Sequence, residues 1–252
     1  EKYNSPIKNS NDIKEFMKFL GKKNAKKSIE RIKTIIDTGN LPDVVEYHEK
    51  YRDNEKEDAI KNLKTIYGIG PVKAAKLYSN HGIKSVEDLQ QQIRNVDETK
   101  ISLTSAQIAG VKYYNDLNAR IPKAEIAMYE KKLRKIINSL DNNAKLCITG
   151  SYRRGKETSG DIDVLLCSKT VKLADFIMKI KEMTVVVLAN GKKKCMLLTK
   201  LNKNSQVRHM DIILTQPKQY AFTQLYFTGS KEFNIKMRNH ALSLGYSSNE
   251  YG

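Results

Sequence analysis

The sequence predicts an α+β fold, in which a helical amino-terminal half is followed by a mixed β-sheet and a short helical tail. Up to about residue 120, apolar residues recur at three- and four-residue spacing and do not alternate as they would in a strand. After residue 121, short apolar runs rich in β-branched residues follow one another. Because helices and strands are segregated along the chain, we expect a mixed sheet with helices on one face.

The composition indicates an anionic partner. The 252 residues include 45 Lys and Arg against 28 Asp and Glu, a formal net charge of +17. Nucleic acid and acidic membrane are the usual partners of such a surplus. No apolar run approaches the roughly 20 residues that span a bilayer, and the chain opens on polar residues without a signal peptide. We therefore expect a nucleic-acid partner, no membrane and no secretion.

The cysteines indicate a reducing compartment. Cys147, Cys167 and Cys195 lie far apart and form no CxxC pair. Two of them lie in apolar runs, where a buried free thiol is the usual state. This pattern favours the nucleus or the cytoplasm, or a viral factory if the source is a virus.

The first helical segments are predicted over residues 12–36. They are joined by the lysine-rich stretch GKKNAKK (21–27), which fits either a solvated helix surface or a contact with DNA. Gly39 ends the second helix, and helical spacing resumes after Pro42 and continues to about residue 120.

A tight turn interrupts this helical half at Gly68-Ile69-Gly70-Pro71. Two glycines that flank one Ile allow backbone N–H groups to face outward at a helix start, where they can hold a DNA phosphate without reading its sequence. With Lys73 and Lys76 after it, the stretch resembles the helix-hairpin-helix motif of DNA repair proteins. A GxG alone could also be a simple turn. We expect Gly68, Gly70 and Lys73 to bind DNA.

The second half begins with a helix over 123–140, which has apolar residues on one stripe. Further helices are predicted at about 172–182, at 219–226 and at 231–244. The predicted strands are Lys145–Thr149, Ile162–Cys167, Thr184–Leu188, Cys195–Leu201 and Val207–Leu214.

Acidic residues within these strands are the candidate catalytic groups. Asp161 and Asp163 lie on the same face of a strand, because side chains alternate, and two carboxylates this close repel unless a cation lies between them. Oxygen ligands alone favour Mg²⁺ or Mn²⁺. A DxD pair alone also fits a solvated strand end. However, Asp211 lies in another apolar strand and also requires a partner.

Residues just before this pair complete a site for phosphoryl transfer. Gly150 and Ser151 at a strand-to-helix turn offer a backbone N–H and a hydroxyl to phosphate oxygens, and Arg154 can neutralise the charge of a leaving group. Two cations held by carboxylates can activate an attacking hydroxyl and stabilise a leaving pyrophosphate. Positioning and electrostatics supply most of the acceleration in such reactions.

Several motifs in a fixed order carry a resemblance to a known family. GSYRRG (150–155), GDIDVLL (160–166), MDIIL (210–214) and LYFTGSKEFNIKMRNHAL (225–242), together with GIGPVKAAKL (68–77) and ARIPKAEI (119–126), resemble the family X DNA polymerases. The resemblance runs from about residue 20 to the end. It implies a short lyase-like domain (1–50), a helix-hairpin-helix subdomain (51–120), a nucleotidyltransferase palm (121–215) and an apparently truncated nucleotide-binding subdomain (216–252).

The resemblance also implies a role for each motif residue. Asp161 and Asp163 would bind both of two Mg²⁺ ions, for which Mn²⁺ could substitute. Asp211 would bind the catalytic ion and help accept the proton of a primer 3′-OH. The incoming nucleotide would contact Arg120, Gly150, Ser151, Arg154, Gly160, Tyr226, Phe227, Gly229 and Asn234. Arg238 would contact the template strand, and the backbone carbonyls of Lys64, Ile66 and Ile69 would bind K⁺ or Na⁺.

Purely structural interpretations remain open for some of these residues. Tyr226 and Phe227 also fit an apolar core, and Arg238 also fits a solvated helix surface. His209, two residues before Asp211, fits a structural neighbour of that carboxylate better than a metal ligand.

The sequence also departs from the family pattern. His209 stands where the family usually has Arg, and Lys231 replaces an acidic residue beside the nucleotide. Arg31 falls at the position of the lyase lysine, so we expect no lyase activity, since arginine stays protonated.

These features predict a monomeric DNA-directed DNA polymerase for base excision repair that fills short gaps in gapped or nicked DNA from deoxynucleoside triphosphates. The alternatives are a template-independent nucleotidyltransferase and a DNA-end-binding scaffold with weak catalysis. The three acids argue against the scaffold.

Overall fold

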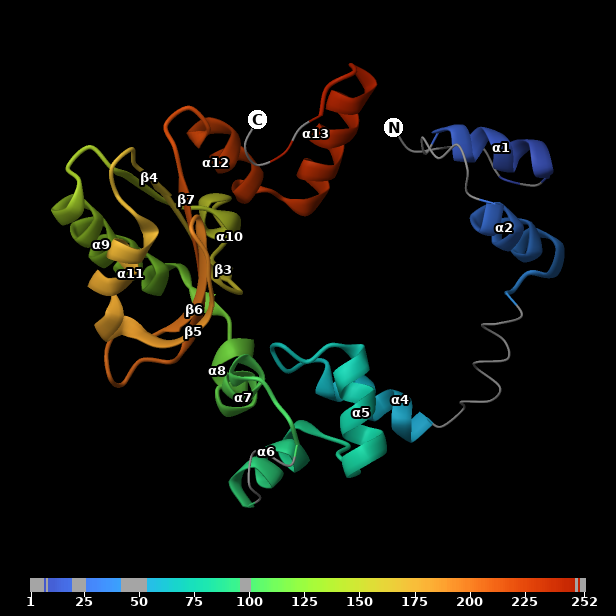
Figure 1. The fold of residues 1–252 in the computed structure, drawn as a ribbon, viewed down its shortest axis with the longest axis horizontal. Helices are drawn as coiled ribbons and strands as arrows, with labels where there is room; N and C mark the ends of the chain where they lie inside the picture. The colour runs from blue at the N-terminus through green and yellow to red at the C-terminus, as the bar shows by residue number, and fades with distance from the viewer. Residues whose placement is uncertain are drawn as a thin grey trace. The chain divides into compact units, whose positions relative to one another are not determined.

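A computed structural model describes residues 7, 9–19, 26–41, 54–95, 101–247 and 249 (Figure 1). The chain divides into two compact units, residues 1–58 and 59–252. Each unit is described by itself.

The first unit contains two short helices, α1 (Ser10–Phe19) and α2 (Lys26–Thr38), which pack against each other. Ile13 and Met17 of α1 are buried, whereas α2 buries no residue fully. The helices expected over residues 12–36 are therefore confirmed for these two segments. Most of the lysine-rich stretch (21–27) and residues 42–53 lie outside the described residues.

The boundary between the units falls within α4 (Asn54–Leu63). The second unit continues with the helices α5 (Pro71–His81), α6 (Val86–Asn95), α7 (Ser105–Lys112) and α8 (Tyr114–Asn118). Their core is built from aliphatic residues such as Leu63, Leu77 and Leu89, all fully buried. The turn between α4 and α5 depends on two glycines. Gly68 has a φ of +81° and its carbonyl accepts a hydrogen bond from Gln107 Nε2 at 2.9 Å. A Cβ on Gly110 would lie 2.2 Å from the carbonyl oxygen of Tyr67, so only glycine lets α7 approach this turn.

A five-stranded mixed sheet forms the centre of the unit (Figure 1). Its strand order is β2-β4-β7-β6-β5, in which β4 and β7 run parallel and the other neighbours run antiparallel. The strands are β2 (Lys145–Ile148), β4 (Ile162–Cys167), β5 (Thr184–Asn190), β6 (Lys194–Thr199) and β7 (Arg208–Thr215), and a separate pair joins β1 (Ile121–Pro122) to β3 (Thr158–Ser159). The five predicted strands and the mixed sheet are therefore confirmed.

Helices α9 (Lys123–Leu140) and α11 (Leu173–Lys179) cover one face of this sheet (Figure 1). Ile126, Tyr129, Leu133 and Ile137 of α9 recur at three- and four-residue spacing and are all fully buried. They pack with alternate residues of the strands, which leaves the other side chains of β4 and β7 for the opposite face.

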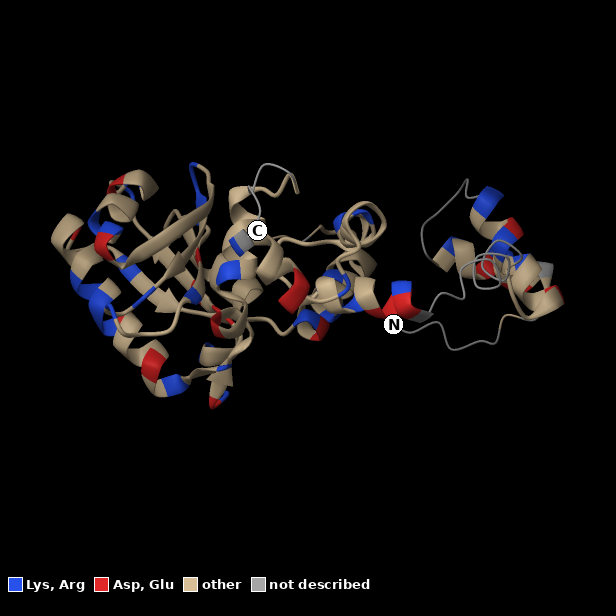
Figure 2. Ribbon diagram, turned by 90° about the horizontal axis from the view of Figure 1, so that it is seen from below, with Lys and Arg blue, Asp and Glu red and all other residues tan. Residues whose placement is uncertain are grey.

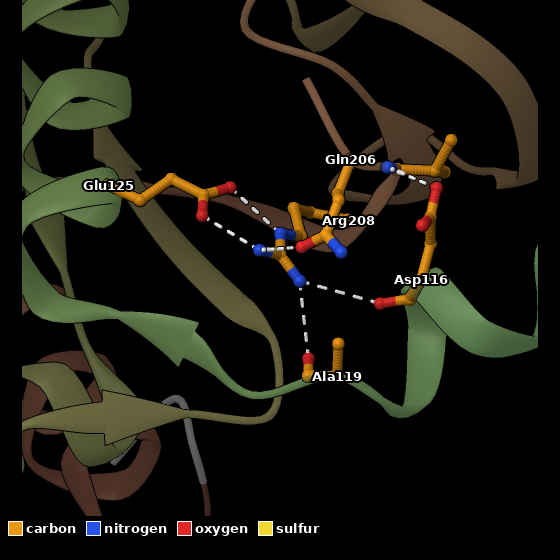
Figure 3. Close-up of polar contacts among 6 residues, drawn as sticks. Asp116, Ala119, Glu125, Gln206 and Arg208 are labelled. Carbon is orange, nitrogen blue, oxygen red and sulfur yellow. Dashed lines mark hydrogen bonds and ion pairs between the residues drawn. The ribbon is translucent and has the colours of Figure 1, made fainter. Parts of the chain in front are cut away.

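A buried arginine ties the helical region to the sheet (Figure 3). The Arg208 side chain is 3% exposed, and its Nε and Nη2 donate to the Glu125 carboxylate of α9 at 2.8 and 2.7 Å. Its Nη1 donates to the carbonyls of Ala119 at 3.2 Å and of Asp116 in α8 at 3.4 Å. Removing one partner of such a buried pair typically costs about 3–5 kcal/mol.

The chain ends with α12 (Tyr220–Thr228) and α13 (Lys231–Ser243), which confirms the helical tail. Gly229 between them has a φ of +68°, and Ser230 caps α13 by accepting a hydrogen bond from the Phe233 N–H. None of the described helices is long and apolar enough to cross a membrane.

Candidate active site

The strand pairing places two of the three acids opposite each other. Asp163 of β4 and Asp211 of β7 are register partners on adjacent parallel strands. Asp161 directly precedes β4 and is exposed. Ile162 and Val164 point to the buried core on the other face, with exposed fractions of 0% and 1%. Alternation along β4 and its pairing with β7 therefore gather the acids on one side of the sheet.

The electrostatics of Asp163 favour a bound cation. Burial, together with the charges of Asp161 and Asp211, raises the pKa of Asp163 to about 7. The carboxylate is therefore only partly ionised at neutral pH unless a positive charge compensates it. Lys194 and Arg154 act in the opposite direction but do not cancel the effect.

Asp211 has one lysine partner. Its Oδ2 forms an ion pair with Lys194 Nζ at 2.8 Å, and its Oδ1 lies 3.6 Å from His209 Nε2. Burial by itself lowers the pKa of Lys194, but the hydrogen bond and the charge of Asp211 outweigh it and the pKa is raised. Sequence reasoning missed Lys194, although a single charged residue in the otherwise apolar strand KCMLLT was a signal.

Two polar atoms at this position are buried without a hydrogen-bond partner, namely His209 Nε2 and Asp211 Oδ1. The ring of Tyr67 packs on the His209 ring, with 5.0 Å between the centroids and a tilt of 43°. Burial raises the pKa of Tyr67, and the charge of Asp211 raises it further. Because Tyr67 lies in the turn before Gly68, the turn that was expected to bind DNA contacts the strand that carries Asp211. The sequence contained no sign of this contact.

The residues present fit a hard divalent cation. Their donors are carboxylate oxygens. One of them, Asp211 Oδ1, is buried without a hydrogen-bond partner, and the raised pKa of Asp163 reflects burial and carboxylate repulsion, both of which a cation would offset. Gly150 has a φ of +58°, and a Cβ there would lie 2.1 Å from Asp163 Oδ2. Among the described residues no three acidic, histidine or cysteine side chains are gathered closely enough to hold a metal ion. The ammonium of Lys194, 2.8 Å from Asp211 Oδ2, already places one positive charge beside that carboxylate.

A cavity of about 530 Å³ adjoins the acids. It is bounded by the turn after β2, by the start of β4 and by α12 and α13. Its lining residues are Gly150, Ser151, Arg154, Asp161, Asp163, Tyr226, Phe227, Gly229, Ser230, Lys231, Asn234, Ile235 and Arg238. The structure therefore brings together most of the residues expected to bind the nucleotide, and Arg238 with them. Arg120, Gly160 and Asp211 are not part of this lining.

The side chains on the helical side of the cavity are held in place. Asn234 Nδ2 donates to the carbonyl of Tyr226 at 2.8 Å, and the Arg238 guanidinium lies over the Tyr226 ring, 5.4 Å from its centroid. Tyr226 and Phe227 form an edge-to-face pair with centroids 5.1 Å apart. Because both rings line the cavity, they are not simply core residues. Arg154 Nη1 donates to the carbonyl of Thr228 at 2.5 Å, which joins the turn after β2 to the end of α12.

Arg120 and Gly160 lie beside the β1–β3 pair. Arg120 donates to the hydroxyl and the carbonyl of Thr158, at 3.2 and 2.7 Å. Its Nη1 would lie 3.4 Å from a Cβ on Gly160. Ser151 Oγ donates to Ser159 Oγ at 2.8 Å, so the hydroxyl expected to bind phosphate is held by β3.

In the turn before α5, the two glycines are open to solvent, whereas the lysine that follows them is bound by the protein itself. Gly68 and Gly70 are exposed, and α5 begins at Pro71 without a side-chain cap. Lys73 Nζ donates to the carbonyls of Ile101 at 3.0 Å and Ser102 at 2.8 Å, which is an internal role. Burial lowers the pKa of Lys73, and the charge of Lys76 lowers it further. The carbonyl of Ile66 accepts the Ile69 N–H at 3.1 Å.

Comparison with known proteins decides the family. The DNA polymerase beta palm family matches residues 120–227, the fingers domain of DNA polymerase lambda matches 61–118, and the DNA polymerase beta thumb matches 223–252. A ternary P/T complex of Leishmania infantum polymerase beta has 33% sequence identity and a TM-score of 0.73, over 79% of this chain and 80% of that chain. The chain belongs to the family X DNA polymerases. A ternary gap complex of the same polymerase has 32% identity and a TM-score of 0.72, over 83% of this chain and 74% of that one.

Relatives within family X include longer proteins. DNA polymerase lambda of Arabidopsis thaliana is 28% identical over 88% of this chain and 43% of its own length. DNA polymerase lambda of Rattus norvegicus is 29% identical, over 88% and 38%. DNA nucleotidylexotransferase of Xenopus laevis is 22% identical, over 81% and 48%. The chain therefore spans less than half the length of each of these family X proteins. Within the chain, the cavity lies where the palm and thumb matches meet.

Proposed function

We propose that this chain is a DNA-directed DNA polymerase that fills short gaps by adding nucleotides to a primer 3′-OH. The observation that carries the proposal is the pair Asp163 and Asp211, in register on adjacent strands beside a cavity lined by Ser151 and Arg154. Gapped or nicked DNA and deoxynucleoside triphosphates are the substrates, in base excision repair in the nucleus or cytoplasm. The protein acts as a monomer.

The carboxylates would hold two Mg²⁺ ions, or Mn²⁺ in their place. Asp161 and Asp163 would bind both ions, and Asp211 would bind one of them after it releases Lys194. Ions bound there supply Lewis-acid activation of the hydroxyl and charge stabilisation for the leaving pyrophosphate. Asp211 would also help accept the proton of the 3′-OH, a role that its Oδ1, which has no hydrogen-bond partner, supports.

The cavity would orient the nucleotide. Ser151, Gly150 and Arg154 would bind the triphosphate, supported by Arg120 and Gly160 at the β1–β3 side. Tyr226, Phe227 and Gly229 would line the sugar, where their close backbone disfavours a 2′-OH. Asn234 would contact the minor-groove edge of the base, and Arg238 the template strand. The contacts of Asn234 and Arg238 with Tyr226 support these roles, because they fix both side chains at the cavity wall.

The turn before α5 would hold the DNA. The exposed backbone at Gly68 and Gly70 suits a phosphate contact. The carbonyls of Lys64, Ile66 and Ile69 would bind K⁺ or Na⁺ that bridges the turn to a primer phosphate. Lys73 contributes indirectly, by holding the turn against residues 101–102.

Extension of a primer across a one-nucleotide gap tests the proposal. With Mg²⁺ present, Asp211→Ala should reduce the rate by about a thousandfold or more while DNA binding is retained. Asp175→Ala, an exposed acid on α11, is the matched control and should behave as wild type. If Asp211→Ala extends the primer as fast as wild type, the catalytic assignment is wrong, and a scaffold that binds DNA ends becomes the better account.

Template-independent nucleotide addition is the second candidate. The similarity to a DNA nucleotidylexotransferase favours it, since that relative shares most of this chain's length. The DNA-holding turn and Arg238 favour templated synthesis. A single-stranded primer separates the two activities: a templated enzyme should leave it unextended, whereas a template-independent one should lengthen it with any nucleotide.

A further inference from the structure

A second cavity, of about 680 Å³, lies at the other end of the same strand pair. It is bounded by the loop after β4, the start of α11, the β5–β6 turn and the end of β7. Its lining residues are Ser168, Lys169, Val171, Lys172, Leu173, Ala174, Asn190, Gly191, Lys192, Lys193, Leu214, Thr215 and Gln216. None of these residues lines the cavity beside the acids. Ser168 lies five residues beyond Asp163, about 16 Å along a strand, so this is a separate site.

The cavity combines an apolar floor with a cationic rim. Val171 and Leu214 line the cavity and are half-buried, and Leu173 beneath them is buried. The lysines on the rim, Lys169, Lys172, Lys192 and Lys193, are all exposed. No lining residue is acidic.

The charge of the rim is largely uncompensated. No ion pair between described residues involves Lys169, Lys172 or Lys192. The neighbouring acid, Asp141, accepts hydrogen bonds from the hydroxyls of Ser168 and Thr170. The Ser168 hydrogen bond contributes most to lowering the pKa of Asp141, followed by the backbone N–H of Asn143 and then the Thr170 hydroxyl. Asp141 is thus engaged by hydroxyls and does not compensate Lys169, Lys172 or Lys192.

We propose that this cavity binds an acidic peptide segment that inserts one apolar side chain between the lysines. The volume lies within the usual range for binding sites, about 300–1,000 Å³. Carboxylates of the peptide complement the rim, and an aliphatic side chain fills the floor, which a small inorganic anion would leave uncovered. Single-stranded nucleic acid is the poorer match, because such sites stack bases on aromatic rings and this lining contains none. The site would recruit a protein partner without occupying the nucleotide cavity.

Fluorescence anisotropy on the full chain tests the proposal. The probe is a short fluorescein-labelled peptide of Glu and Asp with one central Leu, and the comparison probes are the same peptide with Ser in place of Leu and an oligo(dT) of equal charge. Lys169→Glu/Lys192→Glu should weaken binding of the Leu peptide about tenfold. Because lysines and arginines lie on elements throughout the described chain (Figure 2), the matched control is Lys131→Glu/Lys135→Glu on the exposed side of α9, with the same change of net charge. This control should weaken binding less than twofold.

The outcomes separate the alternatives. The Ser peptide should bind about fivefold more weakly than the Leu peptide, and gap filling by Lys169→Glu/Lys192→Glu should remain at the wild-type rate, since neither lysine lies in the nucleotide cavity. Equal losses for both charge-reversal pairs, or equal binding of the Leu and Ser peptides, would show diffuse electrostatic attraction and overturn the proposal. Loss of oligo(dT) binding with unchanged peptide binding would assign the surface to nucleic acid instead.

Discussion

The two ends of the β4–β7 strand pair differ in charge and in burial: one end carries carboxylates and the other carries exposed lysines. At one end, the pKa of Asp163 is raised to about 7 and Asp211 Oδ1 is buried without a hydrogen-bond partner. At the other end, the lysines of the 680 Å³ cavity are exposed to solvent above an apolar floor. The carboxylates at the acidic end repel one another unless a cation is bound, whereas the solvated lysines at the other end cost the free protein little free energy. Buried carboxylates with shifted pKa values are typical of catalytic sites, and an exposed charged rim is typical of binding sites.

Apart from removal of a carboxylate, the largest effect is expected from Gly150→Ala at the acidic end. The added methyl group would lie 2.1 Å from Asp163 Oδ2, so the turn or the carboxylate must move. Gap filling should fall by about a hundredfold or more, since misplacement by an ångström can cost that much. Gly155→Ala is the matched control, because Gly155 also has a positive φ, +80°, but has open space around it. Primer extension should separate the two variants; equal activities would mean that strain alone, and not the contact with Asp163, matters.

Asp163→Asn should stabilise the metal-free protein at alkaline pH. The folded-state pKa of about 7 lies above the ordinary 3.8, so the folded state binds more protons between these values and stability falls as pH rises through this window. The penalty is complete above about pH 7 and is on the order of 2 kcal/mol for a partly exposed carboxylate. Thermal melts in EDTA should therefore show a higher midpoint for Asp163→Asn at pH 8 and a smaller difference at pH 5.

The contrary result would be a wild-type protein as stable as Asp163→Asn at pH 8. It would mean that Lys194 and Arg154 already compensate Asp163, and that the acidic end does not require an external cation. Asp175→Asn serves as the control, since its exposed carboxylate lies outside the cluster.

Lys194→Met should strengthen Mg²⁺ binding by about threefold, an effect typical of losing one partly exposed ion pair. Lys194 Nζ is paired with Asp211 Oδ2, so its removal would leave that oxygen free for a cation. The midpoint of a Mg²⁺ titration followed by thermal stability should shift to lower concentration. Lys193→Met, one residue earlier on the lysine cavity, should leave the midpoint unchanged. A shift to higher concentration would show that Lys194 organises the carboxylate rather than competing for it.

The smallest effect is expected from His209→Arg. A guanidinium carries a fixed charge and several N–H donors, so it should hold the neighbouring Asp211 Oδ1, which lies 3.6 Å from His209 Nε2, and raise the rate of gap filling about twofold. His81→Arg at the end of α5 is the control. Equal rates for His209→Arg and wild type would contradict the role given to His209 beside Asp211.

Local pattern predicted most of the fold and part of the site. Helix α9 and strand β4 begin and end at the predicted residues, because helical spacing and strand alternation are properties of neighbouring residues. The contacts that connect distant segments could not be predicted in this way. The pairing of Lys194 with Asp211 depends on how β6 lies against β7, and the contact of Tyr67 with His209 depends on how a helical turn meets a strand.

Lysine roles were the hardest to assign from sequence. The sequence predicts that Lys73, beside the GIG turn, contacts DNA, whereas in the structure its ammonium donates to two backbone carbonyls. The four lysines of the second cavity come from two segments about 20 residues apart, so only the fold of the sheet brings them together.

The Arg208 contacts have a consequence for motion in the molecule. Arg208 binds α8, the connecting residue Ala119 and α9 together, so the segment between the helical region and the sheet is locked at several points by one buried side chain. A hinge needs residues whose backbone can rotate freely, and this connector has little such freedom. Opening and closing of the cavity is therefore expected near Gly229 and the start of α13, which line it. A crosslink that joins the two sides of the cavity near Gly229 should leave the protein folded and abolish nucleotide addition.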